Sequence, residues 1–92
     1  MDTGFRDIQE RRNMKIKVNA GMTQEQIVLE HLKQNEKGIT PYEAFTLYYI
    51  TRLSGRIFDL RRQGHQISTT TITKHKDGRV HNYALYRLVK SA

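Results

Sequence analysis

Several residue types are missing or scarce in this 92-residue chain, and each absence narrows what the chain can be. There is no cysteine, which excludes a disulfide framework and a cysteine-based zinc site. No apolar run approaches the roughly 20 residues that a membrane-spanning helix needs. The first residues also lack the apolar segment of a signal peptide. We therefore expect a soluble cytoplasmic protein that does not enter a membrane.

Acidic residues are also scarce, and their distribution is uneven. The chain has 16 Lys/Arg against 9 Asp/Glu, a formal net charge of +7. Residues 23–50 are acidic overall, whereas residues 51–92 hold nine Lys/Arg and two Asp/Glu. A half-molecule with such a concentration of positive charge is suited to bind a polyanion. Nucleic acid is the predicted partner; surface charge that serves only solubility is the alternative.

Two short helices are predicted before the basic half begins. Thr23 and Gln26 form a capping box, in which each side chain accepts a hydrogen bond from the other residue's backbone. This first helix should end near Asn35. The segment Thr40–Glu43 starts the second helix with another capping box and a proline at the first helical position. The buried side of the second helix is predicted to consist of Ala44, Phe45 and Leu47 or Tyr48.

The stretch from Ile50 to Gly64 is predicted to form a third helix. Thr51 is the expected N-cap and Gly64 the C-terminal stop. On the outer face arginines surround Gly55, although glycine costs a helix about 0.8–1 kcal/mol relative to alanine. Close approach of a ligand explains this glycine, and close packing on the second helix is the alternative. Apolar residues at helical spacing form the opposite stripe, namely Ile50, Leu53, Ile57 and Leu60.

After Gly64 the periodicity changes from helical to alternating. The segments His65–Lys74 and Val80–Val89 are rich in strand-forming residues. Between them, Asp77 and Gly78 form a hairpin turn signal. Ile39 is expected to add a single pairing residue.

Two helices joined by a tight turn, with the second one basic and followed by a basic hairpin, are typical of a winged helix-turn-helix. We therefore predict an α+β fold of three helices and a C-terminal two-stranded β-hairpin, the wing. Residues 23–92 form the predicted DNA-binding domain, and residues 1–22 a flexible basic arm. Within this arm, residues 14–18 alternate and could instead form a short edge strand.

Residues 24–89 resemble a helix-turn-helix family that is common in bacteriophages and prophages. The resemblance is carried by residues 28–32, by Ile39-Thr40-Pro41-Tyr42-Glu43-Ala44, and by Tyr83-Ala84-Leu85-Tyr86. Its most specific part is the block from Arg52 to Ile67, which contains Arg-Leu-Ser-Gly-Arg-Ile. The resemblance implies a winged helix, a phage-like origin and a small DNA-binding protein in a bacterial cell. It implies no particular target sequence.

The predicted DNA-binding residues form two groups. Arg52 and Arg56 lie one turn apart and could each bind guanine O6 and N7 in bidentate fashion; contact with phosphates alone, or ion pairs with Asp59 or Glu43, are the alternatives. Arg61 is nearer the core and could be structural. The full set on the third helix is Thr51, Arg52, Ser54, Gly55, Arg56, Asp59 and Arg62. The wing contributes side chains for phosphates or the minor groove, namely Lys74, Lys76 and Arg79.

Other side chains give weaker signals. His75 and His81 flank the hairpin turn and could face each other, but a zinc site usually needs three or four ligands. We therefore predict no metal and no cofactor. His31 is expected to be half-buried, and Tyr48 and Tyr86 are expected in the core. No arrangement of residues suggests catalysis, so the chain is not expected to be an enzyme.

These observations favour a sequence-specific double-stranded DNA-binding protein. It would act as a phage-type transcriptional regulator or as an excision or architectural factor. A phage winged helix that binds and inhibits a host protein or a ribonucleoprotein is the alternative from another class. Non-specific nucleic-acid binding is the third hypothesis. Both a monomer and a homodimer remain compatible with the sequence.

Overall fold

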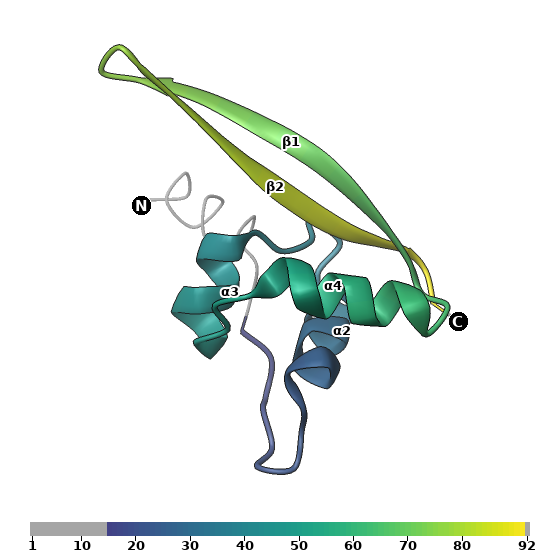
Figure 1. The fold of residues 1–92 in the computed structure, drawn as a ribbon. Helices are drawn as coiled ribbons and strands as arrows, with labels where there is room; N and C mark the ends of the chain where they lie inside the picture. Colours follow the sequence, from purple (N-terminus) through teal and green to yellow (C-terminus); the bar gives the residue numbers. More distant parts are fainter. Residues whose placement is uncertain (1–14, 92) are drawn as a thin grey trace, which may run out of the picture.

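The computed structural model describes residues 15–91, which form three helices and one antiparallel two-stranded ribbon (Figure 1). One end of the ribbon lies on the helices, and the other extends well beyond them. The predicted α+β architecture is thus confirmed. The elements in chain order are α2 (Gln24–Gln34), α3 (Pro41–Tyr48), α4 (Leu53–Arg62), β1 (Gln66–Lys76) and β2 (Arg79–Lys90).

The first two helices begin where their capping boxes predict. The Thr23 hydroxyl accepts from the Gln26 backbone N–H at 3.2 Å, and the Gln26 side chain accepts from the Thr23 N–H at 2.8 Å. Thr40 and Glu43 repeat this exchange at 3.2 and 3.1 Å. Asn35 is the C-cap of α2, also as predicted. These starts depend on residues three positions apart, which is why the sequence alone locates them.

The predicted start of α4 is wrong by one residue. The helix begins at Leu53, and its N-cap is Arg52, which makes no side-chain capping bond. Thr51 lies in a bend before the cap. The reason is the preceding turn, in which Tyr49 adopts a left-handed conformation with φ 59° and the chain needs further residues to change direction. The predicted stop at Gly64 is confirmed by its φ of 103°.

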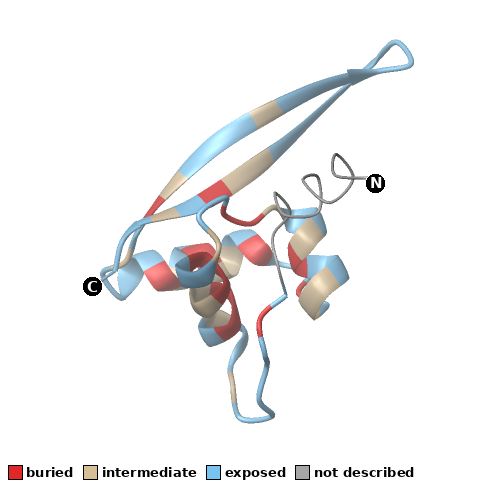
Figure 2. Cartoon of the chain, turned by 180° about the vertical axis from the view of Figure 1, so that it is seen from behind, coloured by how far each residue is buried: buried red, intermediate tan, exposed pale blue. Residues whose placement is uncertain are grey.

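One hydrophobic core joins all the elements, and Figure 2 shows its buried residues on the inward faces of the helices and at the base of the ribbon. The predicted stripe is buried in full, as is Ala44. Phe45 is not buried as predicted: it is 50% exposed, and its ring packs edge-to-face on Tyr49 at the surface. The core consists of Ile16, Ile27, Val28, Leu32, Ile39, Ala44, Ile50, Leu53, Ile57, Leu60, Ile67 and Tyr86.

The segment before α2 contributes a core residue without forming a strand. Residues 15–19 have no strand pairing, so the edge-strand interpretation is wrong for this described part. Instead, the Ile16 backbone N–H donates to the Tyr48 hydroxyl at 3.0 Å, and the Ile16 side chain is buried. The predicted arm therefore contacts the domain from Ile16 onward, and residues 1–14 lie outside the described residues.

His31 lies at the centre of this contact. It was expected to be half-buried, but it has no exposed surface, and its Nδ1 lies 2.6 Å from the Tyr48 hydroxyl. The same hydroxyl accepts from the Ile16 backbone N–H, so Tyr48 contacts both α2 and the segment before it. Burial lowers the pKa of His31, while Glu43 and the Gly38 backbone oppose this shift more weakly.

The lowered pKa of His31 predicts a pH-dependent stability. In the unfolded chain His31 binds a proton near its ordinary pKa of 6.5, whereas in the folded chain burial opposes this protonation. The stabilisation that the buried His31 provides is therefore present above pH 6.5 and is lost as the pH falls below it. Chemical unfolding between pH 8 and about pH 5.5, a window above the usual carboxylate pKa values, should show a falling free energy of unfolding. His31→Gln should flatten this dependence, and the exposed His75→Gln should not. A flat wild-type profile would contradict the prediction.

The wing is a long hairpin closed by a tight turn. Asp77 and Gly78 both have positive φ, 52° and 75°, as a type I′ turn requires. The ribbon joins the helices through the predicted pairing residue, because the Ile39 N–H donates to the Tyr86 carbonyl at 2.8 Å and the Tyr86 N–H to the Ile39 carbonyl at 3.0 Å. The turn and this bridge are both confirmed.

Candidate nucleic-acid interface

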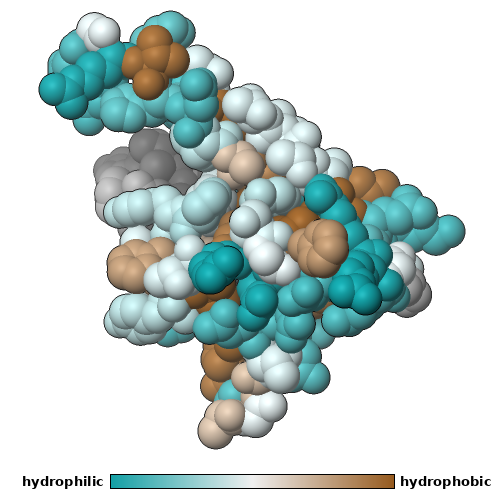
Figure 3. Space-filling view, viewed as in Figure 1, coloured by the Kyte–Doolittle hydropathy of each residue, from teal (hydrophilic) through white to brown (hydrophobic). Residues whose placement is uncertain are grey.

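The outer face of α4 carries the residues predicted to read DNA. They lie on the side of the helix away from the buried Leu53, Ile57 and Leu60. Figure 3 shows this side of the molecule, where mainly hydrophilic groups with a few hydrophobic ones cover α4. Four of the predicted residues are exposed, namely Thr51, Arg52, Ser54 and Arg62; three are partly exposed, namely Gly55, Arg56 and Asp59.

The two arginines predicted to contact bases differ in their surroundings. Arg52 is exposed at the N-terminal end of α4. Arg56 forms an ion pair with Asp59 at 3.2 Å, which is one of the alternatives that the sequence left open. Because both side chains are about one-third exposed, this pair adds little to stability. The ion pair instead orients a side chain, because Asp59 holds the Arg56 guanidinium beside the outer face.

Gly55 lies in open space. A Cβ atom built at this position would meet no atom within 4 Å. The alternative interpretation, close packing of Gly55 on the second helix, is therefore wrong. The helix has a missing side chain at the centre of its outer face, where its backbone is accessible to a ligand.

Gly55→Ala is expected to stabilise the protein and to weaken any binding of a duplex through this face. Alanine is favoured over glycine in a helix by about 0.8–1 kcal/mol, and the added methyl group fits without contact. The same methyl group would hold the α4 backbone away from a groove. Thermal unfolding and duplex titration of the one variant measure both effects. Higher stability with unchanged affinity would show that no ligand approaches this backbone.

Phe58 is an outer-face residue that the sequence reasoning missed. It is 60% exposed, and the Arg62 guanidinium lies 5.8 Å from the centre of its ring. The signal was present in the sequence, because Phe58 falls outside the apolar stripe and next to Ile57. Phe58 thus places an aromatic ring and a cation together on the outer face of α4.

Arg61 is structural. Its Nε and Nη2 donate to the Ile67 carbonyl at 3.1 and 2.7 Å, and Nη2 also donates to the Thr69 hydroxyl at 2.8 Å. These bonds join the last turn of α4 to the first residues of β1. They fix the base of the wing relative to α4.

The basic residues of the wing share one face of the ribbon. Lys74 is paired with His81 and Lys76 with Arg79, and side chains two residues apart on a strand point to the same side. Like charges directly opposite each other repel and destabilise a strand pair. The exposed cluster Lys74, Lys76, Arg79 and His81, which we term the wing ladder, is therefore well suited to an anionic partner.

The histidines of the wing do not face each other. His75 is paired with Val80, and His81 with Lys74, so the two imidazoles lie on opposite faces of the ribbon. Because His81 is paired with Lys74 rather than with His75, its side chain points to the other face of the ribbon from that of His75. Across residues 15–91, no three His, Cys, Asp or Glu side chains lie close enough together to hold a metal ion.

The structure does not gather all the predicted residues into one cluster. The residues of α4 form one continuous face, whereas the hairpin turn with the wing ladder lies at the far end of the ribbon (Figure 1). A partner that touches both must therefore be extended, as a duplex is.

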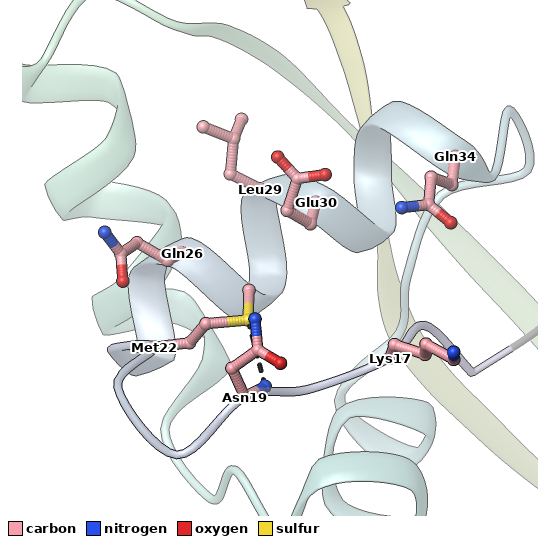
Figure 4. A pocket seen from close by; sticks show the side chains of 7 residues that line it. All are labelled: Lys17, Asn19, Met22, Gln26, Leu29, Glu30 and Gln34. Carbon is pink, nitrogen blue, oxygen red and sulfur yellow. Dashed lines mark hydrogen bonds between the residues drawn. The ribbon is translucent and has the colours of Figure 1, made fainter.

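A shallow hollow lies elsewhere, between the segment before α2 and α2 itself (Figure 4). Its lining mixes polar side chains with Met22 and Leu29, and the Asn19 N–H donates to the Met22 sulfur at 3.4 Å. None of the residues that line this hollow belongs to α4. None of the helices within residues 15–91 is long and apolar enough to cross a membrane.

Comparison with known proteins identifies the family. A family model described as a winged helix-turn-helix domain matches residues 23–91. The chain belongs to the winged helix-turn-helix family. No curated protein and no solved structure gives a significant match.

Membership of the winged helix-turn-helix family suggests a DNA partner for this chain, because such domains are typically non-enzymatic DNA-binding modules. In this family arrangement α3 and α4 form the helix-turn-helix, with α4 as the second helix, and the β1–β2 ribbon is the wing. The match begins at Thr23, the N-cap of α2.

Proposed function

We propose that this protein binds double-stranded DNA in a sequence-specific manner, with α4 in the major groove and the wing on the backbone. The observation that carries the proposal is the outer face of α4, on which Arg52, Arg56 and Arg62 surround the open backbone of Gly55. The major groove is about 12 Å wide and admits an α-helix. Arginine is the side chain that most often reads guanine there.

The place of each residue along α4 and the wing indicates whether it contacts bases or the DNA backbone. Arg52 and Arg56 lie in the N-terminal half of α4, the part of a recognition helix that usually faces base edges. Thr51 and Ser54 lie beside them and can bond to bases or phosphates. Arg62 lies in the last turn and is assigned to a phosphate. The wing ladder adds affinity that does not depend on sequence.

We further propose a role as a regulator of transcription or as an excision or architectural factor of phage type. The support is the small size of the domain and the sequence block from Arg52 to Ile67 that resembles phage and prophage helix-turn-helix proteins. Each of these roles needs a defined DNA site. Sequence-specific binding is therefore the property to test first.

Selection from a random duplex pool, with sequencing at about 0.15 M salt, tests the proposal, because non-specific binding is already weakened at this salt concentration. We expect an enriched motif that Arg56→Ala abolishes or relaxes and that Lys76→Ala preserves with weaker binding. A palindromic motif would indicate a dimer. If wild type retains DNA without enriching any sequence, binding is non-specific; if it retains no DNA, the regulator role is wrong.

One observation favours a second candidate function, binding of a host protein or ribonucleoprotein. Three aromatic residues on and directly after α3 are at least half exposed, namely Tyr42 at 76%, Phe45 at 50% and Tyr49 at 77%. Aromatic residues are enriched at protein interfaces. Co-purification of a host partner, lost on Phe45→Ala and Tyr49→Ala but kept on Arg56→Ala, would support this function.

A further inference from the structure

Phe58 lies outside the hydrophobic core of the described residues, and most of its surface is exposed. Its neighbours Ile57 and Leu60 are buried almost completely, whereas 60% of Phe58 remains accessible. Burying a phenylalanine is worth about 1.5–3 kcal/mol, and most of this free energy is not used within the described chain. Single exposed apolar residues are common, so the position and the surroundings of Phe58 must carry the argument.

Phe58 lies on the outer face of α4, away from the buried Leu53, Ile57 and Leu60. It lies three residues after Gly55 and one turn before Arg62 on the ten-residue helix α4. A Cβ atom at Gly55 would meet no atom within 4 Å apart from its chain neighbours and its own helix backbone, so this position of the face is open. A helix that enters a groove along this face must bring Phe58 against the base edges.

The surroundings of Phe58 limit what it can contact. Arg62 lies over its ring, which holds the ring in place and leaves the opposite side and the edge for a ligand. The other outer-face side chains, Arg52, Ser54 and Arg56, are polar and suited to hydrogen-bonding groups or phosphates. Phe58 alone offers an apolar surface among them.

The major groove presents one apolar group, the C5-methyl group of a pyrimidine. Thymine carries it in ordinary DNA, and 5-methylcytosine carries it in methylated DNA. The remaining groups on the base edges are hydrogen-bond donors and acceptors, which an aromatic ring does not satisfy. Apolar side chains, phenylalanine included, are suited to contact the thymine methyl.

We propose that Phe58 is a specificity residue that recognises a pyrimidine C5-methyl group, that of thymine, within the DNA site. This inference rests on the proposed function and deepens it, because it assigns one base of the motif to one side chain. Arg62 positions the ring, and the open backbone at Gly55 lets the helix approach closely enough for contact.

The test uses the full chain and the duplex motif obtained by the selection described above. Each thymine is replaced in turn by uracil, which removes only the methyl group, and each cytosine by 5-methylcytosine, which adds only that group. For wild type we expect one uracil replacement to weaken binding about fourfold, the factor that one buried methyl group is worth. Phe58→Ala should lose this sensitivity, and Phe58→Leu should retain it.

Phe45→Ala is the matched control, because it removes an exposed phenyl ring from α3 rather than from α4. It should retain the wild-type sensitivity to uracil. If binding responds only to 5-methylcytosine, the methyl group is recognised but thymine is not its source, and the assignment to thymine is overturned. If neither replacement changes the affinity, the inference is wrong while the proposed function stands. If no motif is enriched, the proposed function fails and this inference fails with it.

Discussion

Replacing Gly38 by alanine is expected to lower the free energy of unfolding by about 2–6 kcal/mol. Gly38 has a φ of 89°, a conformation that strains any residue with a Cβ atom. A Cβ atom there would also fall on the Tyr86 carbonyl oxygen and lie 2.9 Å from its carbon. Because both are backbone atoms of β2, the clash cannot be relieved by turning a side chain. The measurement is denaturant unfolding followed by circular dichroism.

Alanine substitutions at two other glycines distinguish the backbone strain at Gly38 from its clash with β2. Gly78 has a φ of 75° but open space around it, so Gly78→Ala should show the conformational strain alone, about 1–2 kcal/mol. Gly55 has open space within a helix, so Gly55→Ala should be stabilising. A loss for Gly38→Ala no larger than that for Gly78→Ala would show that the contact between the α2–α3 connection and the wing is loose.

Removing the three cationic side chains Lys74, Lys76 and Arg79 should make DNA binding much less dependent on salt. Each phosphate contact contributes about −0.9 to the slope of log affinity against log salt, so the triple glutamine variant should lose about 2.7 from that slope. Between 0.05 and 0.2 M salt, wild type should then lose about fortyfold more affinity than the variant. Fluorescence anisotropy with a duplex over this range measures the slopes. The preferred motif should not change, because these residues are assigned to the backbone.

The matched control removes lysines from outside the proposed interface. Lys33 lies in the last turn of α2 and Lys37 in the connection between α2 and α3. The double variant Lys33→Gln with Lys37→Gln should leave the slope unchanged. An equal change per charge in both variants would show only a general effect of net charge. A wing variant with the wild-type slope would show that the wing ladder does not touch DNA.

The elements that the sequence predicted well depend on contacts between near neighbours in the chain. The capping boxes at Thr23 and Thr40 join residues three positions apart, and the hairpin turn needs only Asp77 and Gly78. The alternation of the strands and the apolar stripe of α4 follow from the backbone period alone. The basic outer face of α4 was predictable for the same reason, because a helical period places Gly55 and Arg62 opposite the stripe.

The features that the sequence missed depend on residues far apart in the chain or on how a turn directs it. The turn at Tyr49 precedes an α4 that begins after Thr51, and Phe45 lies against Tyr49 at the surface. The pairing register of β1 and β2 places His75 opposite Val80 and His81 opposite Lys74. The two histidines therefore lie on opposite faces of the ribbon. No local pattern contains this information.

The sequence by itself determined the order and type of the elements, the hairpin turn and the concentration of positive charge in residues 51–92, because each arises from composition or from short-range interactions. Only the tertiary structure decided that His31 is buried and bonded to Tyr48, that Gly38 lies against β2, and that Arg61 joins α4 to β1. It also decided that Phe58 remains exposed beside Arg62. These contacts join separate elements, and they exist only once the core has brought those elements together.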